Sequence, residues 1–178
     1  MFTLITGPMK SGKSLELIAQ VEPYQYTDDD VIYVQPEANV RDSGIQSRLG
    51  VSALAHSISS LHEVKPDFQI IGIDEIHMFD ESDSLVVDTW LKQGKNVIAS
   101  GLDIDYRRKL MPIIARLLEL KPDNIINKLS VCDSCHEYKA QFTQILHNNQ
   151  PILEGLPAIV PEDGTYQYEA RCRDCFVN

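Results

Sequence analysis

Eight residues near the start of the chain have the spacing of a phosphate-binding loop. They read Gly-Pro-Met-Lys-Ser-Gly-Lys-Ser and match G-x-x-x-x-G-K-[ST] at every fixed position. The glycines permit backbone torsions that a Cβ would hinder, so backbone N–H groups can point inward and hold phosphate oxygens. Lysine can place a positive charge beside the β- and γ-phosphates, and the last hydroxyl can bind Mg²⁺. The candidate nucleotide-binding residues are Gly7, Pro8, Met9, Lys10, Ser11, Gly12, Lys13 and Ser14.

A chance match in a glycine-rich turn is the alternative, but the loop lies between an apolar run and a helical pattern, as a phosphate loop requires. A second apolar run, Ile70–Ile73, ends in Asp74 and Glu75. We expect this strand to lie beside the first one, so that Asp74 faces the Mg²⁺ site. Glu75 would point elsewhere, where it could orient an attacking hydroxyl and accept its proton. An ATPase would use the same residue to polarise water, and both carboxylates could also simply end the strand in water.

The four cysteines form two C-x-x-C pairs, Cys132 with Cys135 and Cys172 with Cys175. Two such pairs predict a tetrahedral Zn²⁺ site with four thiolates. The 36 residues between the pairs exceed the interval of an ordinary zinc ribbon, so the metal would close a long loop at its base. Free structural thiols or a redox pair are the alternatives, but no thioredoxin-like context surrounds either pair. A full ligand set leaves no open position, so we expect a structural role.

The elements that must position these residues alternate between strands and helices. Strands are expected at 2–6, 31–35, 68–73, 96–100 and 127–131, and helices at 13–21, 57–64, 82–93 and around 113–118. This alternation predicts an α/β fold with a mostly parallel sheet over residues 1–130. Residues 131–178 show little helical periodicity and hold all four cysteines, which indicates a separate small lobe.

Charge and hydropathy exclude several classes of protein. The 178 residues include 16 Lys and Arg against 26 Asp and Glu, which gives 16 − 26 = −10. Phosphates repel such a chain, so binding to bulk nucleic acid or to an anionic membrane is not expected. The longest apolar runs are too short to cross a bilayer, and the first residues show neither the basic nor the apolar region expected of a secretory leader. A cytoplasmic location is therefore expected, and the cysteines are expected to be reduced.

Together these motifs resemble the thymidine kinase family of the cytosolic, zinc-containing type, which has a RecA-like phosphate-loop core. The segments that carry the resemblance are GPMKSGKSLEL at Gly7–Leu17, GIDEIHMF at Gly72–Phe79, ASGLDIDYRRK at Ala99–Lys109 and YEARCRDC at Tyr168–Cys175. The resemblance implies transfer of the γ-phosphoryl group of ATP to the 5′-hydroxyl of thymidine or deoxyuridine. It also implies a homotetramer and feedback inhibition by thymidine triphosphate.

The resemblance assigns roles to residues one by one. Glu75 matches the catalytic base, Asp74 and Ser14 match the Mg²⁺ side, and Arg41 and His77 join the nucleotide-binding set. The positions that line the family's nucleoside pocket are Met9, Met78, Phe79, Leu102, Tyr106, Thr143 and Tyr168. The zinc lobe would present a lasso-like loop whose backbone groups pair with the thymine edge.

Two other functions stay open on the sequence alone. A nucleotide-binding regulator or degenerate kinase without transfer is suggested by Asn39, where the family usually has Asp, and by Ile145, where Arg is common. The loop Pro161–Gly164 also departs from the family's glycine-rich run. A zinc-ribbon module that binds nucleic acid or protein is the third hypothesis, and the net charge counts against its nucleic-acid form.

Overall fold

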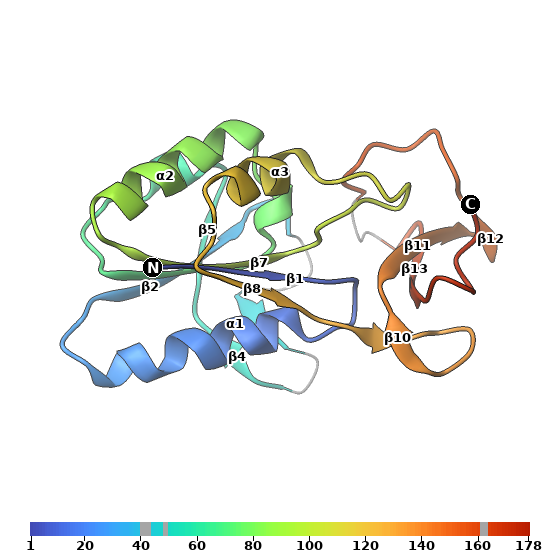
Figure 1. The fold of residues 1–178 in the computed structure, drawn as a ribbon, viewed down its shortest axis with the longest axis horizontal. Coiled ribbons are helices and arrows are strands. Elements are labelled where there is room, and N and C mark those ends of the chain that lie inside the picture. Colours follow the sequence, from blue (N-terminus) through green and yellow to red (C-terminus); the bar gives the residue numbers. More distant parts are fainter. Residues whose placement is uncertain (40–43, 48–49, 161–163) are drawn as a thin grey trace.

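The computed structural model describes residues 1–39, 44–47, 50–160 and 164–178. Its larger part is a sheet with helices on both faces, and a smaller part with short strands lies at one end (Figure 1). Helix α1 (Lys13–Val21) covers one face, while α2 (Ser84–Lys92) and α3 (Pro112–Glu119) cover the other. None of the helices within the described ranges is long and apolar enough to cross a membrane.

Among the described residues, the central sheet has six strands, and every neighbouring pair is parallel. Its strands are β1 (Phe2–Thr6), β2 (Val31–Pro36), β5 (His56–Ile58), β6 (Ile70–Ile73), β7 (Asn96–Gly101) and β8 (Asn124–Asn127). Their order across the sheet is β5-β2-β6-β7-β1-β8. The expected α/β fold with a mostly parallel sheet is therefore confirmed.

The expectation that the strand before Asp74 lies beside the first strand is wrong. Strand β7 lies between β6 and β1 and pairs with both. Apolar periodicity shows that a strand is buried, but it does not say which strand is its neighbour. The inserted strand brings Ser100 of β7 to Asp74, where the Ser100 hydroxyl donates to that carboxylate.

Apolar side chains bury both faces of the sheet. On the α1 side, Leu17 and Val21 pack against Ile5, Ile70 and Ile98. A larger cluster lies under α2 and α3, in which Phe68 and Trp90 meet edge to face with ring centroids 5.2 Å apart. This two-sided burial explains why the strands are continuous apolar runs rather than alternating patterns.

Two expected elements differ from those observed. The helix predicted at 57–64 is instead strand β5 and a short 3₁₀ helix, Leu61–Glu63, because residues 56–58 pair along the free edge of β2. The strand predicted at 127–131 is split into β8, which ends at Asn127, and β9 (Ser130–Val131). Residues 128 and 129 belong to neither strand, and the Lys128 N–H donates to the Thr6 carbonyl at 2.7 Å, which extends the pairing of β8 with β1.

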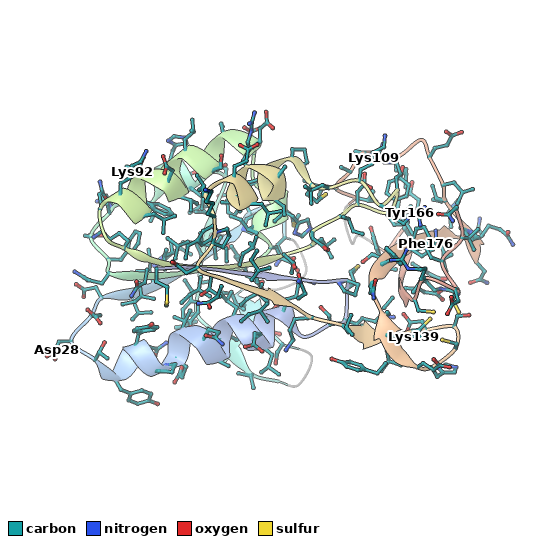
Figure 2. The ribbon with its side chains drawn as sticks, in the orientation of Figure 1. Asp28, Lys92, Lys109, Lys139, Tyr166 and Phe176 are labelled. Atoms are coloured by element: carbon teal, nitrogen blue, oxygen red, sulfur yellow. The ribbon has the colours of Figure 1, made fainter. Side chains whose placement is uncertain are left out.

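The smaller part, called the lobe below, begins at β9 and runs to the C-terminus. Its other strands are β10 (Tyr138–Ala140), β11 (Phe142–His147), β12 (Gln150–Pro151) and β13 (Gln167–Arg171), in the sheets β10-β9 and β12-β11-β13. Figure 2 shows Tyr166 and Phe176 in this lobe, and Asp28 and Lys92 at the far end of the molecule. Outside the lobe, β3 (Ile45–Gln46) pairs with β4 (Ser52–Ala53). Short 3₁₀ helices occur at Glu22–Tyr26, Ile76–Met78 and Glu81–Asp83.

Candidate active site

The phosphate loop connects β1 to α1, and its two glycines have backbone conformations that other residues rarely adopt. Gly7 has φ 143°, and a Cβ at this position would lie 2.4 Å from the carbonyl oxygen of Lys128. Gly12 has φ 80° and precedes the first residue of α1. The Glu16 N–H then donates to the Gly12 carbonyl at 3.0 Å and starts the helical ladder. The loop therefore lies against the N-terminus of α1, where unpaired N–H groups favour an anion.

Two side chains of the loop support its use as a phosphate cradle. The Lys13 ammonium is buried and donates to the Pro8 carbonyl at 2.9 Å across the loop. The hydroxyl of Ser11 is buried and has no hydrogen-bond partner among the described residues. A buried hydroxyl without a partner costs free energy, which an incoming phosphate oxygen would recover. The residues present therefore fit a bound polyphosphate.

Asp74 follows β6 and lies at the same edge of the sheet as the phosphate loop. Its Oδ1 accepts the hydroxyl of Ser100 at 2.5 Å. Burial, followed by the nearby charge of Glu75, raises the pKa of the Asp74 carboxyl to about 6, although hydrogen bonds from Ser100 and Ser14 oppose this rise. A divalent cation would offset both the burial and the repulsion. The donor set of carboxylate and hydroxyl oxygens is the kind that Mg²⁺ prefers.

Glu75 begins a 3₁₀ helix with φ 48°, a left-handed conformation that is uncommon for residues other than glycine. Its side chain is 18% exposed and faces the cavity described below. Oε2 of Glu75 lies 3.4 Å from Nδ1 of His77. This unusual backbone conformation directs Glu75 away from the buried Asp74, although the two residues are adjacent in sequence.

His77 is a buried neutral side chain beneath Glu75. Burial, followed by the positive charge of Lys13, lowers the pKa of the His77 imidazole to about 3, and Asp74 opposes this only in part. The Leu102 N–H donates to Nδ1 at 3.3 Å, which assigns the ring proton to Nε2. The contact between His77 and Glu75 is therefore not an ion pair.

One cavity of about 530 Å³ brings most of the predicted site residues together. Those that line it are Met9, Lys10, Ser11, Gly12, Lys13, Ser14, Glu75, His77, Met78, Leu102, Tyr106, Thr143 and Tyr168. Gly7, Pro8 and Asp74 are not among the residues that line it, and Arg41 lies outside the described residues. Phe79 is buried in the large apolar cluster under α2 and α3 instead of lining the cavity, so the structure gives it a packing role.

The cavity also has a wall that the sequence did not reveal. Its additional lining residues include Ala38, Asn39, Gln46, Ser47, Asp105, Lys128, Leu129, Ser130, Val131, Asp133, Tyr138, Ile145, Ala158, Ile159 and Val160. Residues 128–131 follow the carboxyl end of β8, an edge where ligands of α/β proteins bind. The sequence could have indicated this wall if it had predicted that β8 ends at Asn127.

Asp105 organises the loop that leads from β7 to α3. It is almost fully buried, and its Oδ2 accepts both Nε of Arg107 at 2.8 Å and the Nη2 of that residue at 2.6 Å. Its Oδ1 accepts the N–H groups of Arg107 and Lys109 at 2.8 and 2.9 Å. A carboxylate saturated in this way fixes the loop that carries Tyr106 into the cavity.

Residues 156–160, between β12 and β13, lie beside the cavity, and two tyrosines hold them. The hydroxyl of Tyr106 donates to the Leu156 carbonyl and accepts the N–H of the same residue, both at 3.0 Å. The hydroxyl of Tyr168 donates to the Val160 carbonyl at 3.1 Å. Ala158 and Ile159, between these anchors, pack against the large apolar cluster. Residues 158–160 therefore form part of the cavity wall and are held there by the two tyrosines.

The four cysteine sulfurs all lie within 4.8 Å of one another. The Sγ atoms of Cys135 and Cys172 are 3.8 Å apart. A tetrahedral zinc site with Zn–S bonds of about 2.3 Å requires sulfurs about 3.8 Å apart, so the cluster fits this metal. Cys132 and Cys135 follow β9, while Cys172 and Cys175 follow β13. A metal at this point would join the two halves of the lobe.

Comparison with known proteins gives a consistent result. The family model of thymidine kinase matches residues 1–176. The thymidine kinase of Mycoplasma mobile is 33% identical over 178 residues, which cover 97% of this chain and 84% of that protein. The thymidine kinase of Mesomycoplasma hyopneumoniae strain 7448 is also 33% identical, over 97% of this chain and 92% of that protein. The predicted family and the predicted class of enzyme, a nucleotide-binding kinase, are therefore confirmed, and the chain belongs to the thymidine kinase family.

Proposed function

We propose that the chain transfers the γ-phosphoryl group of ATP to the 5′-hydroxyl of thymidine or deoxyuridine and releases the nucleoside monophosphate. The observation that carries this proposal is the shared cavity, which both the phosphate loop and Glu75 line. A triphosphate on the loop and an alcohol beside Glu75 would meet inside it. The thymidine kinase relatives supply the identity of the alcohol.

Glu75 accepts the proton of the 5′-hydroxyl as the hydroxyl oxygen attacks the γ-phosphorus. The new O–P bond forms while the bond between the γ-phosphorus and the β–γ bridging oxygen breaks, and ADP leaves with that oxygen. Lys13 and the N–H groups of the loop hold the negative oxygens through this change. Ser14 and Asp74 would hold Mg²⁺, which neutralises charge on the β- and γ-phosphates when bound.

The nucleoside would lie between the phosphate loop and the tyrosine-anchored segment. Met9, Met78, Leu102 and Tyr106 supply apolar walls to the cavity, and Ala158, Ile159 and Val160 line it beside the anchoring tyrosines. Apolar walls with a few fixed polar groups are typical of sites for small ligands. Thr143 and Tyr168, on the paired strands β11 and β13, complete the lobe side of the pocket.

Zinc bound by Cys132, Cys135, Cys172 and Cys175 would be structural, since four thiolates leave no open position. A homotetramer, inhibition by thymidine triphosphate and a cytoplasmic location complete the proposal and rest on the family resemblance. Light scattering after size exclusion tests the first of these, and inhibition assays test the second.

A coupled assay with ATP, Mg²⁺ and each common deoxynucleoside tests the reaction. Glu75→Gln keeps the size of the side chain but removes its basicity, and we expect turnover to fall about 100-fold or more while ATP affinity is retained. Glu119→Gln, at the exposed end of α3, is the matched control and should leave turnover unchanged. Nucleotide binding without turnover of any nucleoside by the wild type would favour the regulatory alternative.

A further inference from the structure

The phosphate loop touches the lobe at two consecutive residues. The Met9 N–H donates to Oγ1 of Thr143 at 3.1 Å, and the Ser130 hydroxyl donates to the carbonyl of Lys10 at 3.2 Å. Nζ of Lys10 lies 2.8 Å from Oδ2 of Asp133. These three contacts join residues more than 100 positions apart in the sequence. The loop is therefore supported from the lobe as well as from β1 and α1.

Asp133 is well placed to transmit order from the cysteine cluster, because it lies inside the first C-x-x-C pair. Its Oδ2 also accepts the Ala170 N–H at 2.6 Å, and its own N–H donates to the Ala170 carbonyl at 2.8 Å. Ala170 stands two residues before Cys172, in the strand that leads to the second pair. The carboxylate that holds Lys10 is thus fixed by both halves of the cluster.

Lys10 also has a backbone conformation that needs support. Its φ of 63° is left-handed, which is uncommon for a residue with a Cβ. Such a conformation persists where surrounding contacts determine it. At Lys10 these contacts are the Ser130 hydroxyl on the carbonyl and the Asp133 carboxylate on the ammonium. Both come from the lobe.

We propose that Lys10 is a positioning residue whose ion pair with Asp133 holds the phosphate loop in its nucleotide-binding shape. Affinity for a nucleoside triphosphate then depends on the order of the cysteine cluster, although no cysteine touches the nucleotide. The inference rests on the proposed function, because it takes the loop to be the ATP site. Lys10 occupies one of the four x positions of the G-x-x-x-x-G-K-[ST] motif, for which the motif itself defines no role.

A competing account has Lys10 leave Asp133 and contact the phosphates directly. The two accounts predict opposite results for Asp133→Asn. If the ion pair positions the loop, losing the carboxylate charge weakens ATP binding. If Lys10 binds phosphate itself, the same change releases its ammonium and leaves ATP binding unchanged or tighter.

The test uses zinc-loaded protein and isothermal titration with ATP and Mg²⁺ in the absence of nucleoside. Both side chains of the pair are about 30% exposed, so solvent screening keeps the effect modest. We expect Lys10→Met and Asp133→Asn each to raise the Kd for ATP about two- to fivefold. Lys10→Arg should restore most of the affinity, and the double variant should bind no more weakly than either single variant.

The second C-x-x-C pair offers a matched control. Asp174 lies inside it and pairs with Lys139 at 3.0 Å, and neither residue lines the cavity. Figure 2 shows Lys139 on the lobe. Asp174→Asn therefore removes the same charge from an equivalent motif without touching the phosphate loop. Its Kd for ATP should equal that of the wild type, and the zinc content of every variant should be unchanged.

Amide hydrogen exchange over residues 7–14 gives a readout that does not need ATP. We expect faster exchange there in Lys10→Met and Asp133→Asn, with exchange in the central sheet unchanged. Unchanged exchange in the loop would overturn the inference, as would additive losses of affinity in the double variant. If the wild type failed to bind ATP, the proposed function would fail, while the exchange data would still decide whether the ion pair orders the loop.

Discussion

Replacing Gly7 by Ala places a methyl group where the backbone leaves no room. The new Cβ would lie 2.4 Å from the Lys128 carbonyl oxygen, 3.1 Å from its carbonyl carbon and 3.1 Å from the Ser11 hydroxyl oxygen. Cβ atoms essentially never approach another atom closer than 3.0 Å, so the loop and the end of β8 must separate by about 0.6 Å. The Lys128 carbonyl cannot move easily, because the N–H of the same residue is held by Thr6 at 2.7 Å.

Backbone strain and the steric clash together determine how much ATP affinity Gly7→Ala should lose. A residue with a Cβ at φ 143° carries backbone strain of about 1–3 kcal/mol, and the steric clash adds to it. If the substituted loop relaxes by moving away, ATP must restore the original shape on binding, and the strain then appears as weaker affinity. A cost of about 1–3 kcal/mol corresponds to a rise in Kd of about 5- to 150-fold.

Isothermal titration with ATP measures the affinity, and urea unfolding measures the free energy of unfolding. Gly94→Ala is the control, because Gly94 has φ 79° but a Cβ there would meet nothing within 4 Å. This variant should lose about 1 kcal/mol of stability and keep its ATP affinity. If Gly7→Ala bound ATP as tightly as Gly94→Ala does, the argument that the close approach to Lys128 shapes the phosphate loop would be refuted.

Two further predictions concern His77, which lies beside Glu75, and Tyr106, which holds residues 156–160. Burial holds the folded-state pKa of His77 at about 3, whereas an unfolded histidine has a pKa of about 6.5. Between these two pH values the unfolded chain binds a proton that the folded chain does not. The free energy of unfolding should therefore fall by up to about 1.4 kcal/mol per pH unit as the pH drops through this window. Urea unfolding of His77→Gln should show a flatter pH dependence, whereas an unchanged slope, or an equal effect of exposed His62→Gln, would contradict the assignment. Tyr106→Phe removes both hydrogen bonds to Leu156, which should raise the KM for thymidine about 5- to 30-fold with little change in the Kd for ATP. Steady-state kinetics checks this, and an equal loss of ATP affinity would show that the segment supports the whole site rather than the nucleoside end.

Features carried by neighbouring residues were predictable from the sequence. The phosphate loop is contiguous, and its glycines, lysine and serine define its conformation and chemistry locally. The carboxylates of Asp74 and Glu75 follow directly from the end of an apolar strand. The helix Lys13–Val21 was predicted at its observed bounds, because its apolar spacing and the loop before it agree.

Features that depend on pairing across the chain were not predictable. The segment His56–Ile58 forms a strand because β2 has a free edge with which it can pair. The residue pattern of the segment itself does not indicate this edge. Phe79 was expected at the nucleoside pocket, but the turn after Glu75 directs it into the core. The ion pair of Lys10 with Asp133 joins positions 123 residues apart, so no local pattern could indicate it.

The sequence by itself determined the phosphate loop, the two carboxylates, the four thiols and the alternation of strands and helices, because each is a property of residues adjacent or regularly spaced along the chain. Only the tertiary structure decided that β7 separates β6 from β1, and that the lobe supports the loop and lines one side of the cavity. These outcomes arise from strand order and from packing between distant segments. Hydrophobic burial favours compact packing without specifying partners, so the partners emerge only when the whole chain is folded.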